Sequence, residues 1–575
     1  MIAPGRKDKA HLLEWRIVYV SLVAFYLLVV SVVSLAGNFP LNDDWTYGLG
    51  VQYFAGQGMV YLPGACAAGL VHVLWGALFC KCFGFSYEIL RCASVLMSLW
   101  GSLCLLSALR CLGLRTTSAL VLTLVYAVNP LMLNITFSFM SDTTALALSA
   151  AFLAAYLYAI KKRSCFWFCM ASLALALAIT VRQSALFLSP MLLIWLFMGS
   201  QSRMYQRLLS FAGGIFLVVA AFKAGEVWLA QNRALAPAMV SACAYTTALH
   251  LDFLKLCLAH PLEESLAIVA ACGQVLCYAA LFVIPLWPGL FSVFWRRRIS
   301  WLRNVGWSLG TALGLTGLSA GLTVFRDHRL MPFSENIWRV TSVGALGLMG
   351  IANSPPSIRQ KRVLTALSYA GMLLLLKVGI DFVVLIGAIL RRGKLSCRGM
   401  SLLACSLGLL STAAFCTLET LVRSSDRYYL LLLAPMLLSI AALQKYWRFK
   451  INTAVALVLL TLYAGYSIFA TQDYLSSNRA RWNALHKLEA QGVAWNSIDG
   501  GAEYNVLKNW RIYGSQDRGE APRCDWRWWP ISGEKYIVSY SPIPDYETVS
   551  TEQYFSLLTM SQHQVFVLKQ MIKPR

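Results

Sequence analysis

This sequence predicts a helical protein that crosses a membrane many times and ends in a small α/β domain outside the membrane. Hydrophobic residues make up 58% of the 575-residue chain and charged residues only 13%, whereas about 25% of the residues of a soluble domain are charged. The apolar runs are long and uninterrupted, which indicates spanning helices rather than the alternating strands of a barrel. From about residue 471 onward these runs give way to mixed polar and aromatic sequence.

Hydropathy along the chain predicts about thirteen spanning helices, because a helix of roughly 20 apolar residues crosses the hydrocarbon core of a bilayer. We expect them at 17–37, 88–109, 118–134, 143–160, 164–180, 184–199, 207–230, 263–292, 303–324, 363–390, 398–418, 428–444 and 451–470. The segment 66–82 is also apolar, but at about 17 residues it is short for a span. We expect it to lie along the outer membrane surface.

The basic residues give the expected orientation, because Lys and Arg are enriched in cytoplasmic loops. With 66–82 at the surface, most basic clusters fall on one side: Arg6, Lys7 and Lys9; Arg110 and Arg115; Lys161, Lys162 and Arg163; Arg296, Arg297 and Arg298; Arg391 and Arg392; Lys445 and Arg448. The loop near 325–362 is an exception. We therefore expect a cytoplasmic N-terminus, with both the first outer loop, 38–87, and the C-terminus outside the cytoplasm.

Two domains follow from this pattern. Residues 1–470 are expected to form the transmembrane domain and residues 471–575 an extracytoplasmic C-terminal domain. The second part contains turn residues and short alternating runs such as Tyr536-Ile537-Val538-Ser539-Tyr540, which are typical of strands. About a hundred residues suffice for a small folded domain.

The net charge of +23 would suit a nucleic-acid partner, but the basic residues lie in short clusters between spans. Membrane orientation and anionic lipid headgroups select that arrangement. The 16 Cys residues are scattered, largely within apolar runs, and form no zinc or disulfide pattern. We therefore expect the lipid bilayer as a partner, no nucleic acid, no metal and no cofactor.

The candidate acids are Asp43 and Asp44, directly after the first span, and Asp142, after the third. Carboxylates are costly in hydrocarbon, so acids at its edge are functional candidates. Each also has a structural interpretation, because Asp is a good N-cap: Asp43 or Asp44 for a helix beginning near Trp45, and Asp142 for the helix at Thr143. The sequence does not decide which of the paired acids acts.

Two basic residues are expected on the same outer face as these acids. Arg182 lies in the shortest turn between spans, and Arg427 precedes a late span. Either could bind a phosphate, which arginine does in a fixed, bidentate geometry. The structural alternatives are snorkelling of Arg182 to the membrane surface and a salt bridge of Arg427 with Glu419 or Asp426.

Several motifs occur in one order along the chain and together cover most of it. They are Asn42-Asp43-Asp44-Trp45-x-Tyr47, Phe83-Gly84-Phe85-Ser86 followed by Arg91, Asn129-Pro130 followed by Ser138-Phe139-Met140-Ser141-Asp142, Thr180-Val181-Arg182-Gln183, Asp426-Arg427-Tyr428-Tyr429 followed by Pro435, and Ile498-Asp499-Gly500-Gly501-x-Glu503-Tyr504-Asn505. This set resembles the protein O-mannosyltransferases and lipid A aminoarabinose transferases, in their bacterial branch. These are membrane glycosyltransferases of the GT-C type.

The resemblance implies a GT-C fold and a polyprenyl-phosphate-linked sugar as donor. It also implies inverting transfer to an acceptor outside the cytoplasm, with an acid of the first outer loop as base. The expected location is a bacterial inner membrane. Where aminoarabinose transferases have a Glu-Lys-Pro-Pro-type stretch, this chain reads Tyr61-Leu62-Pro63-Gly64, which argues against that sugar. The sugar and the acceptor, whether glycolipid, polysaccharide or protein, stay open.

The alternative from another functional class is a transporter or flippase of a lipid-linked sugar. Transporters often show internal repeats and helices broken at mid-membrane, and neither pattern is clear here. The candidate acids also gather on one face of the membrane, which favours an enzyme. A polysaccharide ligase or polymerase is a third possibility, but the early pair of aspartates counts against it.

Overall fold

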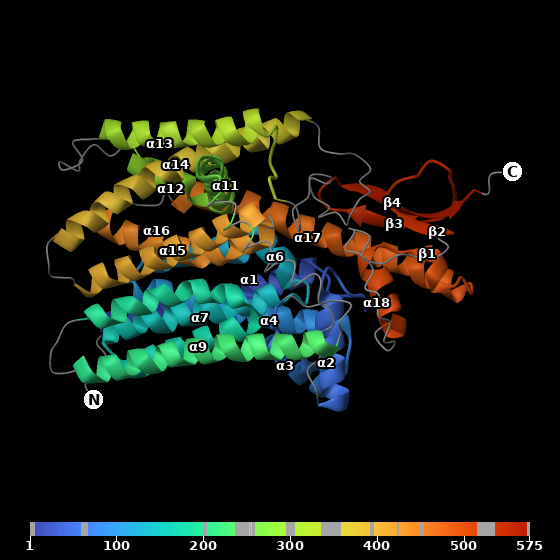
Figure 1. The fold of residues 1–575 in the computed structure, drawn as a ribbon, viewed down its shortest axis with the longest axis horizontal. Coiled ribbons are helices and arrows are strands. Elements are labelled where there is room, and N and C mark those ends of the chain that lie inside the picture. The colour runs from blue at the N-terminus through green and yellow to red at the C-terminus, as the bar shows by residue number, and fades with distance from the viewer. Residues whose placement is uncertain are drawn as a thin grey trace.

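The computed structural model describes residues 6–58, 67–198, 204–235, 259–294, 305–334, 358–391, 396–422, 425–447, 453–513 and 535–571, together with Leu62, Asp252 and Lys255. Most of the long helices lie side by side with their axes roughly aligned, and a small sheet lies beyond one end of them (Figure 1). The N-terminus lies at the opposite end from the sheet.

Helices account for nearly all of the membrane part. Their bounds are α1 Arg6–Val32, α2 Asp44–Gln57, α3 Leu70–Phe83, α4 Tyr87–Cys111, α5 Thr116–Ala127, α6 Pro130–Thr136, α7 Ser141–Lys162, α8 Cys165–Val181, η1 Gln183–Phe197, α9 Met204–Leu235, α11 Pro261–Phe282, η4 Ile284–Leu286, α12 Trp287–Phe294, α13 Val305–Ala320, η5 Gly321–Arg326, α14 Ile358–Arg391, α15 Cys397–Val422, η6 Asp426–Tyr429, α16 Leu430–Trp447 and α17 Thr453–Ala490.

The described residues contain ten helices long and apolar enough to cross a membrane, or eleven if α5 and α6 form one bent span. The multi-span helical fold predicted from the sequence is thus confirmed, with fewer full-length spans than the expected thirteen. The difference lies in α8, with 17 residues, and in η1, a 3-10 helix of 15 residues that contains Pro190. Both are apolar but shorter than the other spans.

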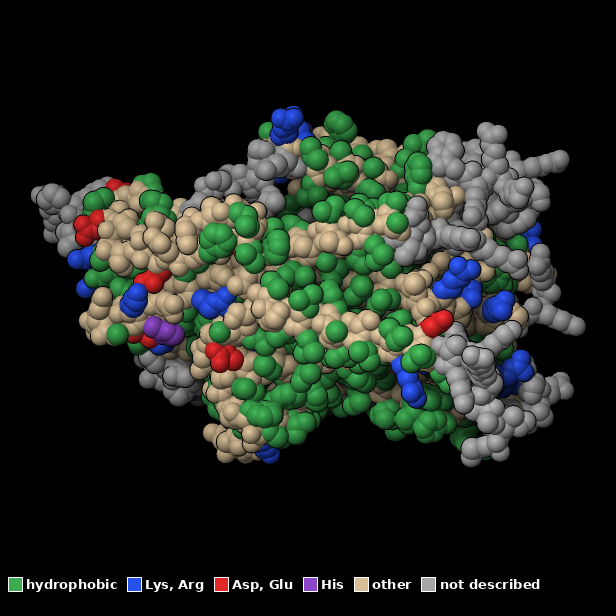
Figure 2. Space-filling model, turned by 180° about the vertical axis from the view of Figure 1, so that it is seen from behind, with side chains coloured by type: hydrophobic (Ala, Val, Ile, Leu, Met, Phe, Trp, Pro, Cys, Tyr) green, Lys and Arg blue, Asp and Glu red, His purple; other side chains and the backbone are tan. Residues whose placement is uncertain are grey.

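The surface of the helical part is apolar, as contact with lipid requires. Large side chains on helices α1, α9 and α17 are exposed, including Leu27, Phe216 and Leu462. Figure 2 shows hydrophobic side chains over the middle of one face, with charged side chains mainly toward the two ends. Because soluble monomers rarely expose such large apolar areas, this face is suited to the interior of a bilayer.

Local sequence explains the short helices and bends at the sheet end. The Asn129 side chain caps α6 by accepting from the backbone N–H groups of Leu131 and Met132, and Pro130 opens the helix. The chain turns by 67° there. Ser86 caps α4 by accepting from the N–H of Ile89. Helix α3 has 14 residues, a length of about 21 Å at 1.5 Å per residue, which supports the expectation that it does not span.

A small α/β unit follows the last long helix, as the sequence predicts. Helix α17 has 38 residues and runs through position 470 without a break. After it come β1 (Ile498–Asp499), α18 (Ala502–Tyr513), β2 (Tyr536–Ser539), β3 (Tyr546–Ser556) and β4 (Ser561–Gln570).

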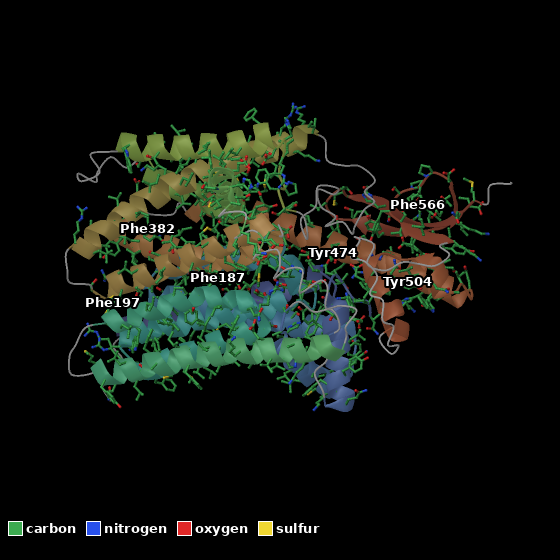
Figure 3. The ribbon with its side chains drawn as sticks, viewed as in Figure 1. Phe187, Phe197, Phe382, Tyr474, Tyr504 and Phe566 are labelled. Carbon is green, nitrogen blue, oxygen red and sulfur yellow. The ribbon has the colours of Figure 1, made fainter. Side chains whose placement is uncertain are left out.

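The strands form one sheet in the order β1-β2-β4-β3. The β1–β2 pair is parallel and the other pairs are antiparallel. Figure 3 labels Tyr474 on α17, Tyr504 on α18 and Phe566 in the sheet, all toward this end of the molecule. The sheet end is therefore joined to the helical part through α17.

Candidate active site

The acidic pair of the first loop begins helix α2, and its two side chains lie in different environments. Asp43 is the residue before the helix but makes no side-chain capping bond. Its side chain is 49% exposed and reaches Arg427. Asp44 is fully buried, and its Oδ2 accepts from the backbone N–H of Leu41 at 3.3 Å. The expectation of a helix near Trp45 is confirmed, but the expected Asp side-chain cap is not formed by Asp43.

Burial determines the chemistry of Asp44. It raises the pKa of this carboxyl from 3.8 to about 7, although the backbone of Phe139 and the charge of Arg91 favour the ionised form. Arg91 is itself buried and donates to the backbone carbonyls of Leu35, Gly37 and Phe39. These contacts place Asp44 beneath the loop, in its supporting core.

The second acid, Asp142, lies in the first turn of α7 and is paired with Arg182. The N-cap of this helix is Met140, so the capping interpretation of Asp142 is wrong. The carboxylate of Asp142 faces Arg182 instead of the start of the helix. Arg182 Nη1 lies 2.8 Å from Asp142 Oδ2, and the side chains are only 12% and 5% exposed. Burial, the largest influence, would lower the pKa of Arg182, but Asp142, Tyr428 and Tyr47 together outweigh it and raise that pKa.

Arg182 occupies the break between two helices. Helix α8 ends at Val181 and the 3-10 helix η1 begins at Gln183, with Arg182 extended between them. This break points the guanidinium inward, since Arg182 also donates to Ser141 Oγ at 3.2 Å. The snorkelling interpretation is therefore wrong, because Arg182 forms a buried ion pair.

Arg427 connects a late segment of the chain to the first outer loop. It lies in η6, the short 3-10 helix that precedes α16, and its side chain is 10% exposed. Its Nη1 lies 2.8 Å from Asp43 Oδ2. The sequence offers Glu419 or Asp426 as partners of Arg427, and the structure gives Asp43.

Tyr428 completes the site and is the residue that sequence reasoning missed as a candidate. The guanidinium carbons of Arg182 and Arg427 lie 5.3 and 5.7 Å from the centre of its ring. Each arginine therefore lies within cation–π distance of one aromatic ring. The signal was present in the sequence, because Tyr428 follows Arg427 in the motif that carried the resemblance.

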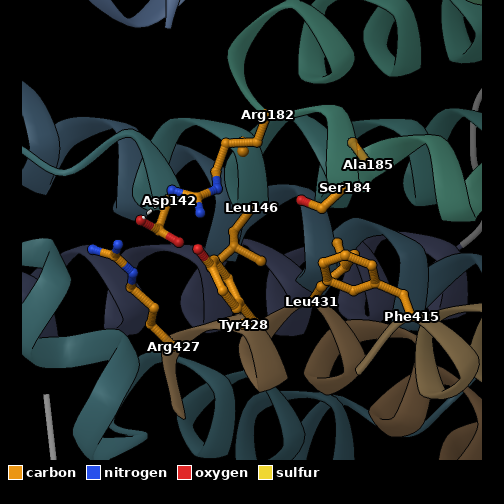
Figure 4. Close-up of a pocket in the computed structure, with 10 residues that line it drawn as sticks. Asp142, Leu146, Arg182, Ser184, Ala185, Phe415, Arg427, Tyr428 and Leu431 are labelled. Carbon is orange, nitrogen blue, oxygen red and sulfur yellow. Dashed lines mark hydrogen bonds and ion pairs between the residues drawn. The ribbon is translucent and has the colours of Figure 1, made fainter. Parts of the chain in front are cut away.

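Asp142, Arg182, Arg427 and Tyr428 line a small pocket that is partly open to solvent. Figure 4 shows the guanidiniums of Arg182 and Arg427 on either side of Asp142, with Tyr428 beside them. The remaining lining is mostly apolar: Ala145, Leu146, Ser184, Ala185, Phe415 and Leu431. A pocket with two arginines at one part and apolar side chains at the other fits a ligand with an anionic head and a hydrophobic body.

Hydrogen bonds behind the pocket join helix α2, which follows Asp43, to the start of α7, which carries Asp142. The Tyr47 hydroxyl of α2 lies 2.7 Å from Ser141 Oγ, which in turn accepts from Arg182. Behind it, His72 of α3 is buried between Thr144 Oγ1 and the carbonyl of Phe139, at 2.8 and 3.1 Å. Thus α2 and α3 hold the start of α7, where Asp142 lies.

The structure brings four of the five predicted site residues together: Asp43, Asp142, Arg182 and Arg427. The fifth, Asp44, is buried below them. Among the described residues, no group of three or more His, Cys, Asp or Glu side chains could hold a metal ion. Most of the Tyr61–Gly64 stretch lies outside the described residues.

Comparison with known proteins agrees with the resemblance read from the motifs. Residues 69–228 match the family model described as dolichyl-phosphate-mannose-protein mannosyltransferase. The predicted family resemblance is confirmed. The matched segment contains Asp142 and Arg182, and it supports glycosyltransferase activity for this membrane protein.

Two solved structures are similar to the chain at low identity. They are crystal structures of ArnT from Cupriavidus metallidurans, one bound to undecaprenyl phosphate and one in the apo state, each with 14% identity and a TM-score of 0.41. The first comparison covers 97% of this chain and 99% of that chain, and the second covers 96% and 97%. No curated protein matches the chain.

Proposed function

We propose that this protein transfers a sugar from a polyprenyl-phosphate donor to an acceptor at the membrane face where the pocket lies. One observation carries the proposal. Two Asp–Arg ion pairs, from four distant segments, meet beside one pocket that is otherwise largely apolar. Two nearby guanidiniums suit a phosphate, and the apolar wall suits the first part of a lipid tail.

In the proposed reaction, the acceptor oxygen attacks the anomeric carbon of the donor sugar as the bond from that carbon to the phosphate oxygen breaks. The acceptor proton passes to a carboxylate, and the lipid phosphate leaves with the electron pair of the broken bond. Direct displacement inverts the anomeric centre. Arg182 and Arg427 stabilise the charge that grows on the leaving phosphate, which is the electrostatic part of the catalysis.

Asp43 is our candidate for the base, and its exposure distinguishes it from the other acids. Asp43 is half exposed, whereas Asp44 is fully buried and Asp142 is 4% exposed. A base must come within hydrogen-bond reach of the acceptor, which favours the exposed carboxylate. Asp142 is then assigned to holding Arg182, because their ion pair is almost closed to solvent.

Binding of the donor would release this base. In the structure, Asp43 is paired with Arg427. A phosphate in the pocket competes for the same guanidinium, because both are oxyanions that arginine binds. Arg427 would turn toward the phosphate and leave Asp43 available to the acceptor. The orientation that we propose puts this face and the C-terminal domain outside the cytoplasm, at a bacterial inner membrane.

The test is transfer of label from a radiolabelled polyprenyl-phosphate sugar pool in membrane vesicles that contain EDTA. We would compare wild type with Asp43→Asn, Asp44→Asn and Asp142→Asn at matched expression. The control is Glu226→Gln, because Glu226 is an exposed acid whose only role in the described structure is an ion pair with Lys223 at 3.7 Å.

Loss of a general base typically costs a factor of about 10² to 10⁴ in rate, and we expect that loss in Asp43→Asn. Glu226→Gln should transfer label as wild type does. If Asp43→Asn also matched wild type, the base assignment would be wrong. If wild type moved no label from any pool, the glycosyltransferase proposal would fail and the transport alternative would take its place.

A further inference from the structure

The turn at Asp499–Asn505 in the C-terminal domain is held by specific hydrogen bonds and has no part in the proposed chemistry. Asp499 Oδ1 accepts from the N–H of Gly501 at 3.0 Å and from Asn505 Nδ2 at 2.8 Å. The N–H of Gly500 donates to Asn505 Oδ1 at 3.0 Å. Gly501 has φ +89°, a backbone conformation that favours glycine. These bonds fix the start of α18.

The turn presents Glu503, whose two carboxylate oxygens face two different partners. Oε2 lies 2.9 Å from Arg481 Nη2 of α17, and the two side chains are 5% and 3% exposed. Oε1 accepts the backbone N–H of Asn42 at 3.2 Å. A Cβ on Gly501 would lie 3.1 Å from Arg481 Nη1, so the glycine leaves room for this arginine. Glu503 thus joins the C-terminal domain to the residue before Asp43.

Aromatic side chains of the first loop, α17 and α18 also contact one another near Glu503. Phe39 of the first loop stacks on Trp482 of α17, with ring centres 5.9 Å apart and planes at 13°. Tyr504 packs edge-on against Trp482, with ring centres 5.8 Å apart, at the end of the molecule seen in Figure 3. Trp45 of α2 is buried with Val506 of α18. The first loop therefore docks on α17 and α18 through apolar contacts and the hydrogen bond from the Asn42 N–H to Glu503.

We propose that Glu503 is a positioning residue, which holds the turn at Asn42 and thereby sets the carboxylate of Asp43 against Arg427. Asn42 has φ +50°, a left-handed conformation that is unfavourable for most side chains. A turn of this kind persists only where its surroundings hold it, and Glu503 binds the N–H of that residue. The inference rests on the proposed function for its effect on rate, but the contact itself is independent of it.

The first experiment shortens the side chain. Glu503→Asp keeps the charge next to Arg481 and withdraws the carboxylate by one methylene from Asn42. Misplacing a reacting group by about 1 Å can cost a factor of about 10², so we expect kcat to fall at least tenfold. The donor KM should stay within about twofold of wild type, because Arg182 and Arg427 are unchanged. The matched control is Glu552→Asp, which shortens the side chain that forms the 2.6 Å ion pair of β3 with Lys487 and should change neither constant.

The second measurement does not depend on activity. Hydrogen–deuterium exchange of the purified, folded proteins should be faster over residues 38–47 in Glu503→Asp than in wild type or Glu552→Asp. If Glu503→Asp fails to fold, Asn42→Val and Asn42→Gly replace it, since they leave the C-terminal domain untouched. Val is strained at φ +50° and should lower kcat, whereas Gly accepts that φ and should retain it.

The outcomes separate the two proposals. Wild-type activity with unchanged kcat and unchanged exchange in Glu503→Asp would overturn the positioning role and leave the proposed function standing. Equal kcat in Asn42→Val and Asn42→Gly would overturn it as well. Faster exchange in Glu503→Asp, together with a wild type that transfers no sugar, would support the contact and refute the proposed function.

Discussion

Replacing Asp44 with asparagine should remove a pH dependence of stability that we can estimate from the structure. The carboxyl of Asp44 is fully buried, and burial raises its pKa from 3.8 to about 7. A raised pKa means that the folded protein binds this proton more tightly than the unfolded chain does. The stability that the proton contributes is therefore fully present below pH 3.8 and is lost as the pH rises through about 7.

At 1.36 kcal/mol per pKa unit, the difference between 3.8 and about 7 amounts to about 4 kcal/mol once both states are ionised. Integrated between pH 5 and pH 8, the loss is about 3 kcal/mol for wild type, and none of it should occur in Asp44→Asn. Asparagine has nearly the same shape and cannot ionise. The two proteins should therefore diverge progressively across this range.

The assay is unfolding of the purified protein in detergent at several pH values, followed in parallel for wild type and Asp44→Asn. Other titrating groups contribute equally to both proteins, so the difference between the two curves isolates Asp44. Parallel curves would refute the reasoning, because they would mean that Asp44 ionises in the folded protein as easily as in the unfolded one. Divergence in the opposite direction would mean that Arg91 and the backbone outweigh burial.

Three further outcomes are expected. Arg182→Lys keeps the charge but loses the fork of donors, so we expect the donor KM to rise about tenfold; an unchanged KM in initial-rate measurements would contradict phosphate binding by Arg182. Tyr428→Ala loses two cation–π contacts of about 0.5–1 kcal/mol each, so transfer should fall five- to thirtyfold, whereas Tyr428→Phe keeps the ring and should stay close to wild type; equal loss in both would implicate the hydroxyl. Gly101→Ala places a Cβ 2.8 Å from the backbone of α7 and should destabilise the folded protein by about 1–3 kcal/mol. The control, Gly310→Ala, meets open space and should not destabilise it. Equal melting temperatures of the two variants would contradict close packing of α4 on α7.

The fold and the members of the site were largely predictable from the sequence, because both depend on local composition. Long apolar runs determine the spanning helices, and the sidedness of Lys and Arg puts Asp43, Asp142, Arg182 and Arg427 on one expected face. The shortfall in span number arises at α8 and at η1, and in η1 Pro190 lies inside an apolar run. Hydropathy does not distinguish that short 3-10 helix from a full-length span.

The pairing within the site was not predictable from the sequence. Asp43 and Arg427 are 384 positions apart, and only the tertiary fold brings them together. Local rules suggested capping by Asp142 and a nearby partner for Arg427, whereas tertiary contacts decided both. The contact of Glu503 with Asn42 is of the same kind, since it joins residues 461 positions apart.

Charge balance in the site leads to a last prediction, about the pH dependence of transfer. In the structure, two arginines offset Asp43 and Asp142, and Asp43 is ion-paired with Arg427. A phosphodiester donor adds one negative charge and draws Arg427 away from Asp43. A lost cation and an added anion both favour the protonated form of a carboxyl group. The Asp43 carboxylate therefore becomes more basic when donor is bound. The profile of kcat/KM reports the free enzyme and that of kcat the donor complex. The acidic limb of kcat should therefore lie at higher pH than the acidic limb of kcat/KM, and both limbs should vanish from the residual activity of Asp43→Asn. Coincident limbs in wild type would show that Arg427 stays with Asp43 throughout the reaction, and the phosphate would then depend on Arg182 alone.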